Sequence, residues 1–278
     1  MLVIGCDFSS SPSRRKPVVV AVSEHSQLEP NKFVRCTLLK IEQCDTLDAW
    51  DQWLQAQPHW TGGFDLPFGL PRELVETLGW PTDWLACMQH YAKLSRADIR
   101  ATFKAFCDAR PVGGKFAHRA TDVPAGSSPS MKWVNPPVAY MLQAGVPRLI
   151  DVGCHFPGLH QGNARKVALE AYPGLLAREV LGNRSYKSDD KAKQTPERLI
   201  ARKDLITALE LGQTRLKLRL KLTHAQRDTL AEDASGDSLD AVLCLMQATW
   251  AQHQHDQGAP LYGLPPDVDP LEGWIVTA

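Results

Sequence analysis

The spacing of hydrophobic residues predicts strands and a helix over the first seventy positions. Residues 2–6 and 17–23 are short apolar runs typical of buried strands, and the loop between them suits a hairpin. A third strand is predicted over 32–41. Residues 45–57 carry apolar side chains at helical spacing, and 60–65 form another short apolar strand. The predicted order is therefore strand, strand, strand, helix, strand.

The pattern changes over 72–148, where it predicts a mostly helical insertion within a single domain of residues 1–278. Helical spacing extends over 83–108, and a Gly, Pro and Ser-rich segment predicts a partly mobile loop around 123–130. The remaining predicted elements are strands over 148–153, 165–173 and 214–222, and helices over 173–181, over 195–211 and from about Ser235, the last with one apolar face. Strands that alternate with helices predict an α/β fold.

Composition narrows the class of protein without naming a function. The 278 residues are 44 % hydrophobic and 22 % charged, and the formal net charge is zero, so only a local basic patch would attract nucleic acid. Seven scattered cysteines without a C-x-x-C pair predict reduced thiols and a cytoplasmic location. The sequence has no cationic leader before an apolar stretch and no apolar run of about 18 residues, so we expect no signal peptide and no membrane partner.

Carboxylates stand at the ends of several predicted elements. Asp7 and Asp65 each follow a strand, Glu170 ends another, and Asp237 and Asp240 share a face of the last helix. A buried carboxylate requires hydrogen-bond donors, a cation or a metal ion. An ordinary turn at Asp7 and a helix-end role for Asp237 are the structural alternatives. Asp240, however, interrupts an apolar helix beside the small Ala241, and together the acids indicate an oxygen-ligand site for a hard cation.

Several short motifs also occur in a recognisable order. They are IGCDFSSSP, GFDLPFGLP, ALEAYPG, YKSDDKAKQTPERLIARKDL, SGDSLDAVLCLMQATWA and LEGWI. In this order they resemble the predicted nucleases of the domain of unknown function 429 family, over essentially the whole chain. The resemblance implies a ribonuclease H-like fold, in which a mixed sheet is flanked by helices, and a metal-dependent nuclease that hydrolyses phosphodiester bonds.

The resemblance also implies which residues carry the chemistry. Asp7, Asp65, Asp237 and Asp240 would be catalytic residues and ligands of Mg²⁺ or Mn²⁺, with Glu170 as a further metal ligand. Two such ions would generate a hydroxide nucleophile and stabilise the leaving oxygen. No protein nucleophile is needed, in keeping with a sequence that has no convincing Ser/His/Asp or Cys/His arrangement.

Basic residues supply the expected contacts to a nucleic-acid partner, either DNA or RNA. Lys187 lies in the YKSDD motif, and Arg119 follows a basic helical stretch in the insertion. Lys217 and Arg219 belong to the alternating segment 214–222, which places them on one strand face. A solvated basic face is the alternative for each of them.

Two other functions compete with a nuclease. An actin-like ATPase or sugar kinase would place phosphate loops near CDFSSS and near IDVGCHFPG (150–158), although neither has the closely spaced glycines of a phosphate-binding loop. A non-catalytic nucleic-acid-binding module of the same fold is the other alternative.

Overall fold

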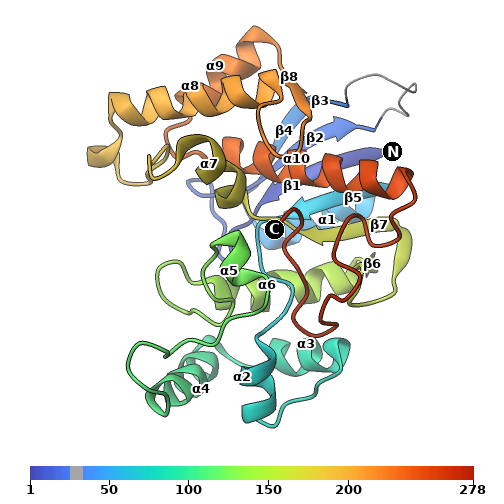
Figure 1. Ribbon diagram of the computed structural model, residues 1–278, viewed down its shortest axis with the longest axis vertical. Helices are drawn as coiled ribbons and strands as arrows, with labels where there is room; N and C mark the ends of the chain where they lie inside the picture. Colours follow the sequence, from blue (N-terminus) through green and yellow to red (C-terminus); the bar gives the residue numbers. More distant parts are fainter. Residues whose placement is uncertain (26–33) are drawn as a thin grey trace.

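The structure, a computed structural model that describes residues 1–25 and 34–278, is built around a six-stranded mixed sheet (Figure 1). The strand order is β4-β2-β1-β5-β7-β6. The strands are β1 (Leu2–Asp7), β2 (Val18–Glu24), β4 (Lys40–Cys44), β5 (Trp60–Phe64), β6 (Cys154–His155) and β7 (Asn163–Glu170). The hairpin of β1 and β2 is antiparallel, as is the pair of β2 and β4, whereas β1, β5, β7 and β6 run parallel.

Helices pack around this sheet, so the predicted α/β fold with a mixed sheet flanked by helices is confirmed. The helices outside the insertion are α1 (Leu47–Ala56), α7 (Pro173–Leu181), α8 (Pro196–Leu211), α9 (His224–Glu232), α10 (Asp237–Asp256) and the 3₁₀ turn η1 (Lys191–Lys193). A short parallel ribbon of β3 (Arg35–Thr37) and β8 (Arg219–Lys221) lies beside α8 and α9 (Figure 1).

Between β5 and β6 the chain is helical, as the sequence predicts. This part contains α2 (Arg72–Thr77), α3 (Trp84–Ala92), α4 (Arg96–Asp108), α5 (Asp122–Ala125) and α6 (Val138–Asp151). Helices α2, α3 and α4 lie at the end of the molecule opposite α8 and α9 (Figure 1). Helix α5 falls inside the segment predicted as a loop.

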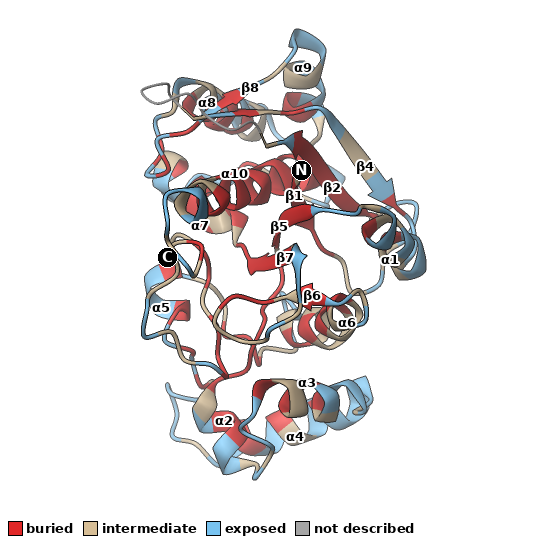
Figure 2. Cartoon of the chain, turned by 90° about the vertical axis from the view of Figure 1, so that its right-hand side faces the viewer, coloured by how far each residue is buried: buried red, intermediate tan, exposed pale blue. Residues whose placement is uncertain are grey.

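Helix α10 is the central helix and packs directly on β1. It is buried nearly all round over its first 13 residues, so the single apolar face predicted for it is wrong (Figure 2). Gly5 makes the close approach possible, because a Cβ there would lie 2.0 Å from the backbone nitrogen of Leu245 and 2.2 Å from the carbonyl oxygen of Ala241. Ala241, the small neighbour of Asp240, is fully buried at this contact.

Three predicted strands differ from those observed. Residues 148–151 continue helix α6, because Leu142, Val146 and Leu149 repeat at helical spacing and are all buried. The strand predicted over 32–41 begins outside the described residues and divides into β3 and β4. Alternate residues of 214–222 are buried as expected, yet only Arg219–Lys221 form a ladder, after a positive φ of 51° at Lys217.

Two further features concern the thiols and the length of the helices. All seven thiols are free and buried. Among the described residues we find no helix with both the length and the apolar character needed to cross a membrane.

Candidate functional site

Asp7 and Asp65 lie on adjacent parallel strands at the same edge of the sheet. Asp7 is the last residue of β1, Asp65 follows β5, and the Asp65 amide donates a hydrogen bond of 2.9 Å to the Cys6 carbonyl. Side chains alternate between the faces of a strand, so Asp7 points to the same face as Gly5. Likewise, Asp65 shares its face with Gly63, where a Cβ would lie 2.6 Å from the Cys244 carbonyl oxygen of α10. Both aspartates therefore face α10.

Asp240 reaches this position from the first turn of α10. Its side chain is fully buried, and its two carboxylate oxygens accept hydrogen bonds from the Tyr186 hydroxyl and the Lys187 ammonium. Lys187 fits here because Gly236 has no Cβ, which would lie 2.7 Å from the Cβ of Lys187. The segment that carries Tyr186 and Lys187 thus supplies donors to a carboxylate that helix α10 brings to the site.

Asp237 is held on the outer side of the same helix turn. Its Oδ1 accepts a hydrogen bond of 2.7 Å from Lys16, whose ammonium also binds Asp189 at 2.9 Å. Asp237 does not cap α10, since Asp233 accepts hydrogen bonds from the amides of Ser235, Gly236 and Ser238 at the start of the helix. A capping role for Asp237 is therefore wrong, whereas its place in the first turn of α10 is one that the helix dipole favours for an acid, and its carboxylate pairs with Lys16.

The electrostatics of the carboxylates show an excess of negative charge. Burial, with Asp240 as the next cause, raises the pKa of Asp65 to about 7, and the same two causes raise the pKa of Asp7 well above its ordinary value. Among the residues that the structure describes, neither carboxylate has a hydrogen-bond donor. Asp240, followed by Asp7 and Asp65, raises the pKa of Lys187 despite the burial of its ammonium. A second ammonium, that of Lys16, bonds Asp237 and also interacts with Asp7.

Glu170 ends β7 beside Asp65 but points to the other face of the sheet. Glu170 is paired in register with Phe64, so the two side chains share a face of the sheet. Asp65, the next residue after Phe64, points to the opposite face, which is the one that α10 covers. Both Glu170 oxygens accept hydrogen bonds of 2.7 Å from Arg119, and Oε2 also accepts one of 2.8 Å from the Phe68 amide. Glu170, predicted as a metal ligand, is thus engaged by protein donors.

Arg119 is buried in an ion network instead of being displayed to a polyanion. Besides Glu170 it binds Asp122 through Nη2 at 2.9 Å, and its Nη1 donates to the Glu272 carbonyl at 3.2 Å. The Glu272 carboxylate accepts from the Ala120 amide at 2.8 Å. Arg119 therefore joins the insertion, β7 and the C-terminal segment.

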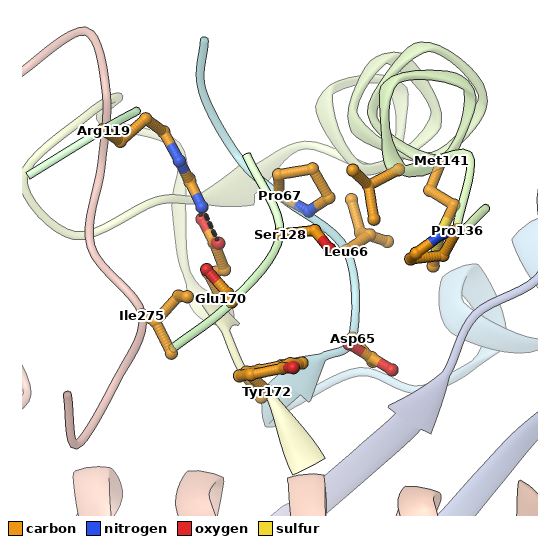
Figure 3. A pocket seen from close by; sticks show the side chains of 13 residues that line it. Asp65, Leu66, Pro67, Arg119, Ser128, Pro136, Met141, Glu170, Tyr172 and Ile275 are labelled. Carbon is orange, nitrogen blue, oxygen red and sulfur yellow. Dashed lines mark hydrogen bonds and ion pairs between the residues drawn. The ribbon is translucent and has the colours of Figure 1, made fainter. Parts of the chain in front are cut away.

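Two cavities adjoin Asp65, and Tyr172 lines both. The first, of about 70 Å³, lies toward the insertion and is lined by Leu66, Pro67 and Met141 together with Arg119 and Glu170 (Figure 3). The second, of about 210 Å³, lies along α7 and is lined by Arg178, Arg184, Tyr186 and Lys187 among others. Lys187 is the only predicted substrate contact in the second cavity.

Lys217 and Arg219 lie elsewhere, on the exposed side of the segment that leads into β8. They line neither of the two cavities. Their role as contacts to nucleic acid stays a prediction.

Sequence reasoning missed Lys16, Tyr172 and Tyr186. Tyr172 and Tyr186 lie in the motifs ALEAYPG and YKSDD, two residues from Glu170 and one residue from Lys187, both predicted site residues. That proximity is the available signal, because nothing in the spacing shows that either ring meets the site.

No protein-family model matches the chain, and searches of curated proteins and of solved structures also found no match.

The donor set suits a hard divalent cation, although the side chains as placed do not form a closed cage. Asp7, Asp65 and Asp240 offer carboxylate oxygens, the ligands that Mg²⁺ and Mn²⁺ prefer. Within residues 1–25 and 34–278, no three His, Cys, Asp or Glu side chains are arranged closely enough to hold a metal ion. The Lys187 ammonium lies beside these carboxylates and neutralises part of their charge.

Proposed function

We propose that this protein is a metal-dependent phosphodiesterase with a ribonuclease H-like fold, acting on nucleic acid. One observation carries the proposal: Asp7, Asp65 and Asp240 come from two adjacent parallel strands and the central helix and lie close enough to raise one another's pKa, whereas the Lys187 ammonium bonds directly to Asp240 alone. Burying that much uncompensated charge is costly unless a cation binds. The strand order, with β1 between an antiparallel and a parallel neighbour, supports the same proposal.

Each side chain has a role that follows from its place. Asp7, Asp65 and Asp240 would hold Mg²⁺ or Mn²⁺. Asp237, which is bound by Lys16, would contribute negative charge beside the ion without being a direct ligand. The bound ion would lower the pKa of a water molecule and stabilise charge on the phosphodiester. Lys187, half-buried and adjacent, would donate to a phosphate oxygen once the carboxylates have an ion to neutralise them.

The test compares Mn²⁺ binding and phosphodiester hydrolysis in the wild type and in Asp65→Asn. Asparagine keeps the shape and removes the charge, so we expect Mn²⁺ affinity measured by calorimetry to fall by tenfold or more, on the order of 1.4 kcal/mol, and hydrolysis to be lost. Asp228→Asn, at an exposed aspartate of α9, is the matched control. Unchanged Mn²⁺ affinity in Asp65→Asn would contradict the metal site.

The same titration separates the competing functions. Heat released by ATP, and metal binding only when ATP is present, would favour a kinase or ATPase. In a kinase or ATPase the phosphate loop near 150–158 would follow a strand. Residues 148–151 are instead the end of helix α6, so the structure does not support that alternative here. Metal binding without hydrolysis of any DNA or RNA substrate would favour a non-catalytic module.

A further inference from the structure

Among the residues that the structure describes, Tyr172 and Asp65 are the two that border both cavities of the site. Tyr172 is half-buried, it precedes α7, and it borders the same cavity as Asp65 in Figure 3. The function proposed above assigns it no role. Its position between two differently lined cavities indicates what each cavity would accept.

The ring is held in place before any ligand binds. The Tyr172 amide donates to Gln247 Oε1 at 3.0 Å, and Arg178 donates to the Tyr172 hydroxyl at 3.2 Å with its guanidinium 5.2 Å from the ring centre. Gly174 leaves room for the ring, because a Cβ there would lie 2.7 Å from the Tyr172 Cζ. An aromatic ring fixed in this way loses little conformational entropy when a ligand stacks on it.

The two cavities differ in chemistry. Arg178, Arg184 and Lys187 line the cavity along α7 together with Asp65. Arg184 pairs with Asp204 and Lys187 with Asp240. Arg178 donates to the Tyr172 hydroxyl and to the Ala125 carbonyl, and neither of these oxygens carries a charge that would neutralise the guanidinium. This lining suits the phosphates of a polyanion.

The cavity toward the insertion has a mostly apolar lining with a few polar groups. Leu66, Pro67 and Met141 form much of its wall, and Ser127 and Ser128 add hydroxyl groups. Gly174 and Arg178 belong to the other cavity, so the side of the Tyr172 ring away from them borders this one. An apolar wall, an aromatic ring and hydroxyl groups together suit a planar, polar-edged nucleobase.

We propose that Tyr172 is a stacking platform for an unpaired base of the substrate, with the neighbouring phosphates in the α7 cavity. The inference rests on the proposed function and names its substrate class: single-stranded nucleic acid or an unpaired segment of it. In a duplex both faces of each base are covered by neighbours, so the base cannot stack on Tyr172 unless it leaves the helix.

The experiment measures anisotropy of short fluorescent phosphorothioate oligonucleotides in Mn²⁺, using a single strand and a hairpin duplex of the same sequence. We expect the wild type to prefer the single strand. Tyr172→Ala should weaken single-strand binding by about 5- to 150-fold, and Tyr172→Phe, which keeps the ring, by at most about threefold. Gly174→Ala, which displaces the ring without removing it, should fall between them.

Tyr140→Ala is the matched control. Tyr140 is also half-buried and also has an arginine, Arg96, over its ring at 5.1 Å, but it lines neither cavity, so its removal should leave binding unchanged. Equal loss in Tyr140→Ala, no loss in Tyr172→Ala, or equal affinity for the duplex would overturn the inference.

The two proposals fail in different ways. Asp65-dependent Mn²⁺ binding without any oligonucleotide binding overturns the stacking platform and leaves the metal site. Tyr172-dependent binding of single strands, with Mn²⁺ affinity unaffected by Asp65→Asn, overturns the metal-dependent nuclease and leaves the platform.

Discussion

At the scale of single residues, the site is governed by carboxylates that lack enough donors. Asp65 is half-buried beside Asp240, and burial is the main cause that raises its pKa to about 7, from about 3.9 in an unfolded chain. The folded protein therefore binds more protons than the unfolded chain between about pH 4 and pH 7. Across that window the free energy of unfolding falls as pH rises.

Replacing Asp65 by asparagine removes this proton linkage. In the metal-free protein we expect Asp65→Asn to raise the melting temperature at pH 8 by about 3 °C or more. The effect should be much smaller near pH 4, where the wild-type carboxyl is protonated in the folded protein and about half protonated in the unfolded chain. Melting curves in chelator at several pH values measure this. Asp228→Asn, an exposed aspartate on α9, should shift the melting temperature equally little at every pH. A wild type that becomes more stable from pH 5 to pH 8 relative to Asp65→Asn would contradict the argument.

At the scale of elements, the position of α10 on β1 decides whether the carboxylates meet. Asp240 belongs to a helix and Asp7 to a strand, so their separation depends on how closely the two backbones approach. Gly5 sets that approach, because its missing side chain leaves space for the backbone at Ala241 and Leu245. The contact is between main chains, which cannot move aside as a flexible side chain can.

Adding one methyl group at Gly5 should therefore displace α10. We expect Gly5→Ala to lower the free energy of unfolding by about 3 kcal/mol or more and to weaken Mn²⁺ binding in whatever protein folds. Urea unfolding and calorimetry measure the two effects. Gly114→Ala, where the nearest atom would be 4.0 Å away, should change stability by no more than about 0.5 kcal/mol. Equal stability of the two variants would show that β1 and α10 can separate freely.

At the scale of the whole molecule, Arg119 connects parts that are far apart in sequence. It is almost fully buried with Asp122 of the insertion and Glu170 of β7, and it also binds the backbone at Glu272. The Thr121 hydroxyl accepts a further hydrogen bond of 2.9 Å from the Ile275 amide of the C-terminal segment. Leu271, Ile275 and Val276 of the C-terminal segment are buried, so this segment is part of the interior.

Loss of the arginine should leave two buried acids without their cation. We expect Arg119→Met to lower the free energy of unfolding by about 3–5 kcal/mol at pH 8, and less at pH 5, because burial raises the pKa of Glu170 and an unpaired acid protonates more readily. The double variant Arg119→Met with Glu170→Gln should recover part of the loss. Urea unfolding measures all three proteins. A loss below about 1 kcal/mol would mean that the network contributes little to holding these parts together.

The sequence by itself determined the local features of this protein. Short continuous apolar runs specified β1, β2 and β5, and the acids at the ends of β1 and β5 marked one edge of the sheet, because the carboxyl ends of parallel strands meet there. The position of Asp240 in an apolar helix correctly indicated a buried carboxylate. These features depend on short stretches of chain, so spacing and residue type suffice to predict them.

Tertiary structure decided which side chains share the site. The register of β7 with β5 turned Glu170 away from Asp65 toward Arg119, and a shift of one residue would have reversed that. The entry of α7 placed Tyr172 between the two cavities, and the close packing of α10 brought Lys187 to Asp240. Such outcomes depend on distances between segments that are remote in sequence, and neither periodicity nor composition contains those distances.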